Sequence, residues 1–228
     1  MAVMALTRST IGKKVIMAVT GLIWIGYVVM HMYGNLKVFL GPEVFNHYAE
    51  GLRVLGEPVF GRLHLLTIAR IVLVGSIAAH VWAAVTLTRQ AQIARPQRYA
   101  VTKRQEADYA ALTIRYGGIA IFFFILYHLA HLTWGVPGVH NNYIRGDAYH
   151  NLAIGFQNPL NVILYLVALT ALGFHLYHGT WSLCQTLGLV SHDSTPPIRA
   201  LAWLLAIVVP VGFALVPISV MLGITALQ

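Results

Sequence analysis

The chain has 228 residues, of which 58% are hydrophobic and 10% are charged, whereas globular proteins average about 45 to 50% and about 25%. A chain of this size cannot bury so much apolar surface in its own interior, which excludes a soluble enzyme and a disordered tail and leaves the bilayer as solvent. The formal net charge is +8 and Cys184 is the only cysteine, which excludes an internal disulfide scaffold and an all-cysteine metal site.

Five apolar runs, each near the roughly 20 residues that cross a bilayer, follow one another along the chain. They cover about 15–40, 63–88, 112–136, 159–187 and 201–222. Backbone polar groups cannot face lipid unsatisfied, and a barrel would show short alternating segments, so each run predicts a helix. The sequence therefore predicts an all-α membrane protein, a single domain over 1–228 with five transmembrane helices.

The basic residues fall between the apolar runs, so they indicate topology, and we expect no nucleic-acid partner. One set of connections carries ten of them: Arg8, Lys13, Lys14, Arg89, Arg95, Arg98, Lys103, Arg104, Arg115 and Arg199. The other set carries four: Lys37, Arg53, Arg62 and Arg145. This asymmetry predicts a cytoplasmic N-terminus, an external C-terminus and a basic 89–115 connection where a soluble partner could dock on the inner face.

Histidines occur inside four of the five runs, where ionisable residues are costly and therefore candidates for function. The six are His31 in the first run, His80 in the second, His128 and His131 in the third, and His175 and His178 in the fourth. For any one of them, the alternative is a packing histidine that is hydrogen-bonded to a neighbouring helix.

Depth in the membrane groups four of these histidines into two pairs. At a rise of about 1.5 Å per residue, His31 and His128 lie about 25 and 24 Å from the inner ends of their helices, and His80 and His175 about 12 and 18 Å. Two pairs at two depths are what bis-histidine ligation of two haems needs. We therefore predict that the first four helices form a haem-binding bundle.

Three further residues are candidate partners of the haem propionates. Arg70, expected to be buried in the second helix, could pair with a propionate, or it could snorkel or hydrogen-bond to another helix. His131 and His178 each follow a predicted ligand by three residues, and each could be a propionate partner or a rival ligand.

Two stretches of sequence resemble a known family. The first is Ser-Thr-Ile-Gly-Lys-Lys at 9–14 with Met-Ala-Val-Thr-Gly-Leu at 17–22, followed by His31, Gly-Asn-Leu at 34–36 and Gly-Pro-Glu at 41–43. The second is Phe-His-Leu-Tyr-His-Gly-Thr-Trp-Ser at 174–182, continued by Gln-Thr-Leu-Gly at 185–188. Together with the five runs, they resemble the cytochrome b membrane-anchor subunit of succinate:quinone oxidoreductases (succinate dehydrogenase and fumarate reductase), in the single-anchor, di-haem class.

The resemblance implies two haem b groups, with His31 and His128 holding the outer haem and His80 and His175 the inner one. It also implies two partner subunits on the inner face of a bacterial cell membrane, a flavoprotein with FAD and an iron–sulfur protein. The resemblance also implies that the dehydrogenase active site is on a partner subunit, and the single cysteine, Cys184, excludes an iron–sulfur cluster in this chain. Electrons from succinate would pass through the clusters and haems to a quinone, expected to be menaquinone, as in respiratory complex II of the tricarboxylic acid cycle.

The direction of catalysis and the quinone site also follow from this resemblance. Relatives specialised for fumarate reduction carry a Glu two residues before the fourth-helix ligand, whereas this chain has Gly173, which favours succinate oxidation. The candidates for quinone binding lie in the first outer connection, where a solvated polar loop explains them equally well: Glu43, His47, Glu50 and Arg53.

Three other functions stay open at this point. The membrane subunit of a respiratory nitrate reductase, or of another quinone-linked oxidoreductase, also has five spans and four ligand histidines, but it lacks the 9–14 stretch. A proton-coupled transporter could use intramembrane histidines as relays, but it should show repeated halves and broken helices. A haem-free structural anchor is the third.

Overall fold

The computed structural model describes residues 7–94 and 109–225, and these residues form helices and no strands. Five helical segments within them are long and apolar enough to cross a membrane: Thr10–Leu40, His64–Ala94, Ile114–Trp134, Pro159–Thr186 and Thr195–Met221. The predicted all-α fold with five transmembrane helices is thereby confirmed. The basic residues of the predicted docking platform at 95–108 lie outside the described residues.

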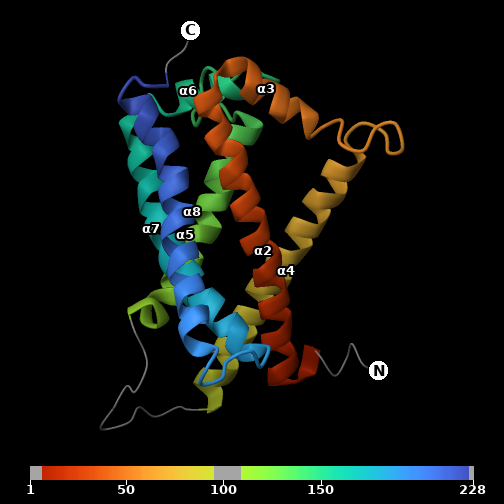
Figure 1. Cartoon of the computed structure of the whole chain (residues 1–228), viewed down its shortest axis with the longest axis vertical. Helices are drawn as coiled ribbons and strands as arrows, with labels where there is room; N and C mark the ends of the chain where they lie inside the picture. Colours follow the sequence, from red (N-terminus) through yellow and green to blue (C-terminus); the bar gives the residue numbers. More distant parts are fainter. Residues whose placement is uncertain (1–6, 95–108, 226–228) are drawn as a thin grey trace.

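The helical elements follow one another along the chain (Figure 1). The five long elements are α2 (Thr10–Leu36), α4 (His64–Ala94), α5 (Tyr109–His128), α7 (Pro159–Thr186) and α8 (Thr195–Met221). Four short ones accompany them: the 3₁₀ turn η1 (Lys37–Leu40), α3 (Pro42–Gly51), the π-helical η2 (Leu129–Trp134) and α6 (Ala148–Gly155). Thus α3 and α6 add two short helices that the apolar runs did not predict.

Two long helices begin earlier than their apolar runs, for reasons of local chemistry. The side chain of Ser9 accepts a hydrogen bond from the Gly12 N–H at 3.0 Å, so this N-cap starts α2 among polar residues. At the start of α8, Pro196 and Pro197 occupy the first turn, where proline costs no helical hydrogen bond. The expected fifth span, which treats these prolines as a connection, is therefore one to two turns too short.

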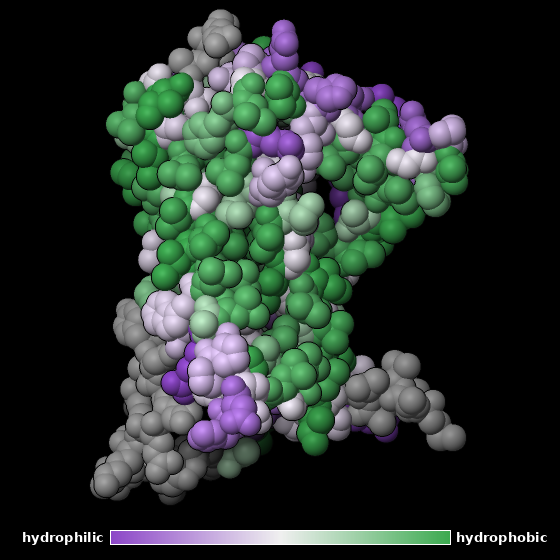
Figure 2. All heavy atoms as spheres, viewed as in Figure 1, coloured by the Kyte–Doolittle hydropathy of each residue, from purple (hydrophilic) through white to green (hydrophobic). Residues whose placement is uncertain are grey.

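The long helices form a bundle from which α4 diverges at one end. α7 packs along α5 and α8, and α2 packs against α4, α7 and α8. In Figure 1, α4 lies close to α2 near the N-terminus of the chain and leans away from it toward α3. Figure 2 shows apolar side chains over most of the visible face, with hydrophilic residues gathered near both ends. This distribution fits a multi-pass membrane protein.

The two ends of the bundle differ in composition and structure. One end, which we call the N-terminal end, carries the start of α2 and the α7–α8 connection, and the other, the C-terminal end, carries α3 and α6 (Figure 1). Of the described basic residues at the helix ends and connections, the N-terminal end has Arg8, Lys13, Lys14, Arg89, Arg115 and Arg199, and the C-terminal end has Lys37, Arg53, Arg62 and Arg145. The asymmetry therefore persists without the residues at 95–108.

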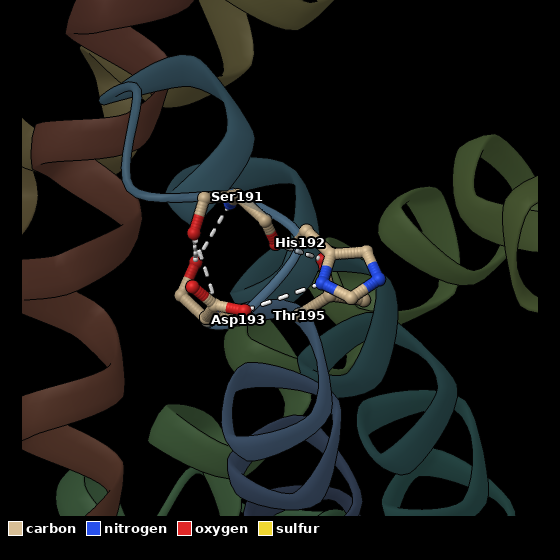
Figure 3. Close-up of polar contacts among 5 residues, drawn as sticks. Ser191, His192, Asp193 and Thr195 are labelled. Carbon is tan, nitrogen blue, oxygen red and sulfur yellow. Dashed lines mark hydrogen bonds and ion pairs between the residues drawn. The ribbon is translucent and has the colours of Figure 1, made fainter.

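The α7–α8 connection is a polar turn that is stabilised by hydrogen bonds among its own residues (Figure 3). The Ser191 N–H donates to Ser194 Oγ at 2.7 Å, and the Ser194 hydroxyl donates to the Leu189 carbonyl at 2.7 Å. His192 and Asp193 contact each other through Nδ1 and Oδ1 at 3.2 Å. Their side chains are fully exposed, so this turn faces water at the N-terminal end.

A buried core closes the C-terminal end of the bundle. Asn46 of α3 donates from Nδ2 to Asp147 Oδ1 at 2.9 Å and accepts from the Tyr149 N–H at 2.9 Å, which ties α3 to the start of α6. Beneath this contact lies the main apolar cluster: Val38, Phe45, Tyr149, Leu152, Ala153, Phe156, Val162, Tyr165, Val216 and Val220. The bundle is thus most tightly packed on the side of α6, α7 and α8.

Candidate functional site

Four intramembrane histidines from four different helices form two ring pairs. His31 of α2 and His128 of α5 have ring centroids 5.8 Å apart. His80 of α4 and His175 of α7 have ring centroids 6.2 Å apart. The structure thus brings together the two pairs that the depth estimate predicts.

The two pairs lie at two levels along the bundle. α2 passes the ring of His80 at Gly21, where an added Cβ would lie 3.6 Å from His80 Cε1, and it reaches His31 ten residues later. α5 passes the ring of His175 at Gly118, again with 3.6 Å to Cε1, and reaches the other pair ten residues later. At about 1.5 Å per residue, both helices place the two levels about 15 Å apart.

The ring separations suit two imidazoles on opposite sides of one metal ion. A metal–imidazole bond of about 2.0–2.1 Å puts each ring centroid about 3 Å from the metal, so two opposed rings have centroids about 6 Å apart. The observed 5.8 and 6.2 Å are close to this value. Among the described residues, no group of three or more His, Cys, Asp or Glu could hold an ion alone, so further ligands would have to come from a prosthetic group, as a porphyrin supplies them.

The hydrogen bonds of His80 leave one ring nitrogen free for a metal. Thr20 Oγ1 donates its only hydrogen to the Ile16 carbonyl at 2.7 Å and lies 3.1 Å from His80 Nδ1. Since a hydroxyl has one donor and two acceptor positions, Thr20 accepts from an Nδ1–H of His80. Nε2 then keeps its lone pair, which is the tautomer that a ligating histidine needs.

Several buried polar atoms between the helices have no hydrogen-bond partner. Among the described residues they are Trp24 Nε1, His140 Nε2, His175 Nδ1 and Thr180 Oγ1. Trp24 lies on α2 between the two levels, and its indole can only donate. A buried donor without a partner costs about 1–3 kcal/mol, so a bound group that carries acceptor atoms would stabilise this region. Together with the four imidazoles, the atoms of this set that lie on α2 and α7 fit a haem.

A chain of hydrogen bonds connects His128 to a second, fully buried histidine. Tyr165 Oη lies 3.2 Å from His128 Nδ1 and 3.0 Å from His131 Nδ1. His131 has 0% exposure, its Nε2 lies 3.1 Å from Asn161 Nδ2, and its carbonyl contacts His140 Nδ1 at 2.9 Å. Both ring nitrogens of His131 are therefore engaged by protein groups, an arrangement typical of a packing histidine.

The other two candidate propionate partners lie near the ring pairs. Arg70, expected to be buried, is exposed, because α4 leans away from α2 over this part of its length. It lies ten residues before His80 on α4, toward the C-terminal end of the bundle, which is also the end of the His31 pair. His178 follows His175 by three residues on α7.

The candidate quinone residues lie on α3 and just after it. Glu43 and His47 are exposed on α3. Glu50 forms ion pairs with Arg53 at 2.7 Å and Arg62 at 2.6 Å, and the hydrogen bond from Arg53, with the charges of both arginines, lowers the pKa of the Glu50 carboxyl. The structure thus brings Glu50 and Arg53 together as a partly exposed ion pair, while Glu43 and His47 are exposed.

An apolar pocket of about 300 Å³ lies between α5 and α7 and was not predicted from the sequence. Gly117, Ala171 and Phe174 line it, and it reaches His175. His175 thus belongs both to the lining of this pocket and to the ring pair with His80.

Sequence reasoning singled out histidines and missed the hydroxyl groups that orient them. Thr20 and Tyr165 are polar residues inside apolar runs, and this was the available signal, because such residues usually find a specific partner in a membrane.

No protein-family model matches the chain, and none of the curated proteins or solved structures with which it was compared matches it either.

Proposed function

We propose that this chain is the cytochrome b membrane anchor of a succinate:quinone oxidoreductase, which holds two haem b groups and connects an iron–sulfur partner subunit to a quinone. The observation that carries the proposal is the assembly of four intramembrane histidines, one from each of four helices, into two ring pairs. Packing histidines have no reason to pair at two levels of a bundle, whereas bis-histidine ligation of two haems requires it.

Each pair would hold one haem between its two imidazoles. His31 and His128 would hold the haem at the C-terminal end of the bundle, and His80 and His175 the haem at the N-terminal end. When bound, haem b supplies one-electron redox chemistry, while the chain supplies ligands, orientation and a dry surrounding. The apolar side chains of α2, α5 and α7 exclude water, and Thr20 fixes the tautomer of His80.

The proposed partners follow from what this chain lacks. Its only cysteine, Cys184, is buried, so the clusters and the FAD would be carried by an iron–sulfur subunit and a flavoprotein. The positive-inside rule puts the N-terminal end of the bundle in the cytoplasm of a bacterial cell, and the partner subunits would dock there. The quinone, expected to be menaquinone, would reach the protein from the lipid.

Succinate oxidation is the proposed direction. A Cβ added at Gly173 would lie 2.9 Å from the Ala206 carbonyl of α8, a backbone atom that cannot move away easily. The position therefore has no room for the carboxylate that relatives specialised for fumarate reduction carry there. This close helix contact supports an anchor without that proton-transfer group.

The test is a haem count on the purified membrane complex. A pyridine haemochrome assay should give two b-type haems per chain, and succinate should reduce at least one of them in a reduced-minus-oxidised spectrum. Two haems that a quinol reduces and succinate does not would point to another quinone-linked oxidoreductase. A complex without haem would contradict the proposal and leave a structural anchor or a proton-relay protein.

A further inference from the structure

In each ring pair, one histidine contacts a hydroxyl group on another helix through Nδ1 and the other histidine does not. His80 Nδ1 lies 3.1 Å from Thr20 Oγ1, and His128 Nδ1 lies 3.2 Å from Tyr165 Oη. By contrast, His175 Nδ1 has no hydrogen-bond partner. The ring of His31 has only a marginal contact of 3.5 Å with the amide of Asn35, a residue of its own helix. The same asymmetry thus occurs at both levels.

The direction of the hydrogen bond at Thr20 follows from its other partners. Its hydroxyl hydrogen goes to the Ile16 carbonyl at 2.7 Å, so Oγ1 can only accept from the imidazole. Nδ1 of His80 must therefore carry the proton that Oγ1 accepts.

The direction of the hydrogen bond between His131 and Tyr165 follows from a chain of contacts that begins at Asn161. Asn161 Oδ1 accepts from the Tyr127 hydroxyl at 2.7 Å, and Nδ2 donates to the Gly155 carbonyl at 2.8 Å, which fixes the orientation of this amide. The same Nδ2 is 3.1 Å from His131 Nε2. Because Nδ2 can only donate, Nε2 of His131 accepts, and the proton of this neutral ring is on Nδ1.

Tyr165 is then an acceptor for His131, and its other contact is with His128, where either the imidazole or the hydroxyl can donate. The Nδ1–H of His131 donates to Tyr165 Oη at 3.0 Å. If His128 binds a metal through Nε2, its proton is also on Nδ1 and donates to the same oxygen. If Tyr165 instead donated its hydrogen to His128 Nδ1, the proton of the His128 ring would be on Nε2 and would prevent ligation through that nitrogen.

We propose that Thr20 and Tyr165 are positioning residues, each of which accepts the Nδ1–H of one axial histidine and thereby lowers the reduction potential of one haem. The inference rests on the proposed function. An acceptor at the distal ring nitrogen fixes the ring orientation and makes the ligand more basic. A more basic ligand stabilises the oxidised iron more than the reduced iron, so the potential falls. Because the two levels are about 15 Å apart, each hydroxyl acts on its own haem.

The experiment is a potentiometric titration of the purified complex, followed by the haem absorbance, in Thr20→Val and Tyr165→Phe. Each substitution keeps the shape of the side chain and removes the acceptor. We expect each variant to keep two haems and to raise one midpoint potential while the other stays at the wild-type value, with a different haem affected in each. The double variant should show both shifts.

Two controls, together with the packing of the Tyr165 ring, separate this effect from general disturbance of the bundle. Thr86→Val removes a hydroxyl that bonds only within α4, to the Trp82 and Ala83 carbonyls, and it should leave both potentials unchanged. Thr20→Ser restores the acceptor and should restore the potential. Tyr165→Phe keeps the edge contacts of this ring with Phe124 and Phe156, at 4.8 and 4.7 Å, so the core should remain folded.

Failure of this inference differs from failure of the proposed function. Two haems in the wild type, with potentials that stay the same or fall in Thr20→Val and Tyr165→Phe, would overturn the positioning role alone. Absence of haem from the wild-type complex would overturn the proposed function before any variant is made. If Thr20→Val loses a haem, the test of the proposal is the midpoint potential of the same haem in Thr20→Ser. A potential that differs from that of the wild type would contradict the proposal.

Discussion

The imidazole of His31 stands edge-on to that of His128, with the ring planes at 83° and the centroids 5.8 Å apart. Aromatic rings hold His31 in place from two other sides. Tyr27 stacks on it at 5.3 Å, and Phe213 of α8 lies 5.5 Å away. His31 is therefore oriented mainly by packing, whereas His128 has a hydrogen bond to Tyr165. The fifth long helix, which carries no histidine, thus still contributes to this pair.

Alanine at one member of a pair should remove one haem and leave the other. We expect His80→Ala or His175→Ala to lose the haem of the N-terminal end, and His31→Ala or His128→Ala that of the C-terminal end, because one imidazole alone does not give bis-histidine ligation. The measurement is the haemochrome count per chain, with quinone-linked turnover expected to fall. His178→Ala is the matched control and should keep both haems. Loss of a haem in this control, but not in His175→Ala, would mean that the ligand choice is wrong.

Gly155 should be indispensable for the buried contacts of His131. A Cβ at this position would lie 2.8 Å from His131 Nε2 and 3.0 Å from Cε1, and the ring, with 0% exposure, has no free space to move into. Overpacking of this kind costs about 1–3 kcal/mol, so Gly155→Ala should lower the unfolding temperature of the detergent-solubilised protein.

The control for this prediction is Gly26→Ala. Gly26 lies inside α2 with nothing within 4 Å of an added Cβ, so alanine should leave the unfolding temperature unchanged or raise it slightly. Equal unfolding temperatures for the two variants would show that His131 is not confined as the structure indicates.

The fold could be predicted from the sequence because the bilayer demands long apolar helices, and hydropathy reports those directly. The short helices could not. α3 and α6 are tied together by Asn46 and Asp147, which are 101 residues apart in sequence, and no local pattern indicates such a contact. The early start of α8 was not predicted either, because its two prolines are typical both of a loop and of the first turn of a helix.

The pairing of the candidate site could be predicted as well, because depth in the membrane follows from residue counting along helices of known direction. The hydroxyl partners could not, since they depend on how each helix is rotated about its axis. Thr20 and Tyr165 face histidines of other helices, and hydropathy does not report how a helix is rotated about its axis. Arg70 was expected to be buried for the related reason that an apolar run does not show where a helix leans away from its neighbours.

Acidification should loosen the contact between α3 and α6. Burial raises the pKa of Asp147, but the hydrogen bonds from the His150 N–H and from Asn46 outweigh it, and the pKa is lowered overall. A carboxyl with a lowered pKa in the folded state stabilises the fold above its unfolded value of about 3.9, and this contribution is lost as the pH falls through the folded-state pKa.

Asp147→Asn tests this pH dependence. Asparagine still caps a helix but has no charge, so the variant should unfold at a lower temperature than the wild type at neutral pH. Its unfolding temperature should fall less steeply in the acid range, so that the difference from the wild type narrows there. Glu50→Gln is the comparison, because the exposed ion pairs of Glu50 contribute little to stability. The interpretation fails if Asp147→Asn loses stability as steeply as the wild type below about pH 4.

Orientation in the membrane can be read from two engineered cysteines. Cys184 is the only cysteine and is buried, so Cys184→Ala gives a background without reactive thiols. His47→Cys would put a thiol on the exposed surface of α3, and Asp193→Cys would put one in the exposed α7–α8 connection at the opposite end. The excess of Lys and Arg at the N-terminal end predicts that this end is cytoplasmic. A membrane-impermeant thiol reagent should therefore label His47→Cys on intact cells, and Asp193→Cys only after the membrane is opened. The reverse pattern would place the partner subunits at the other end of the bundle and exchange the inner and outer ring pairs.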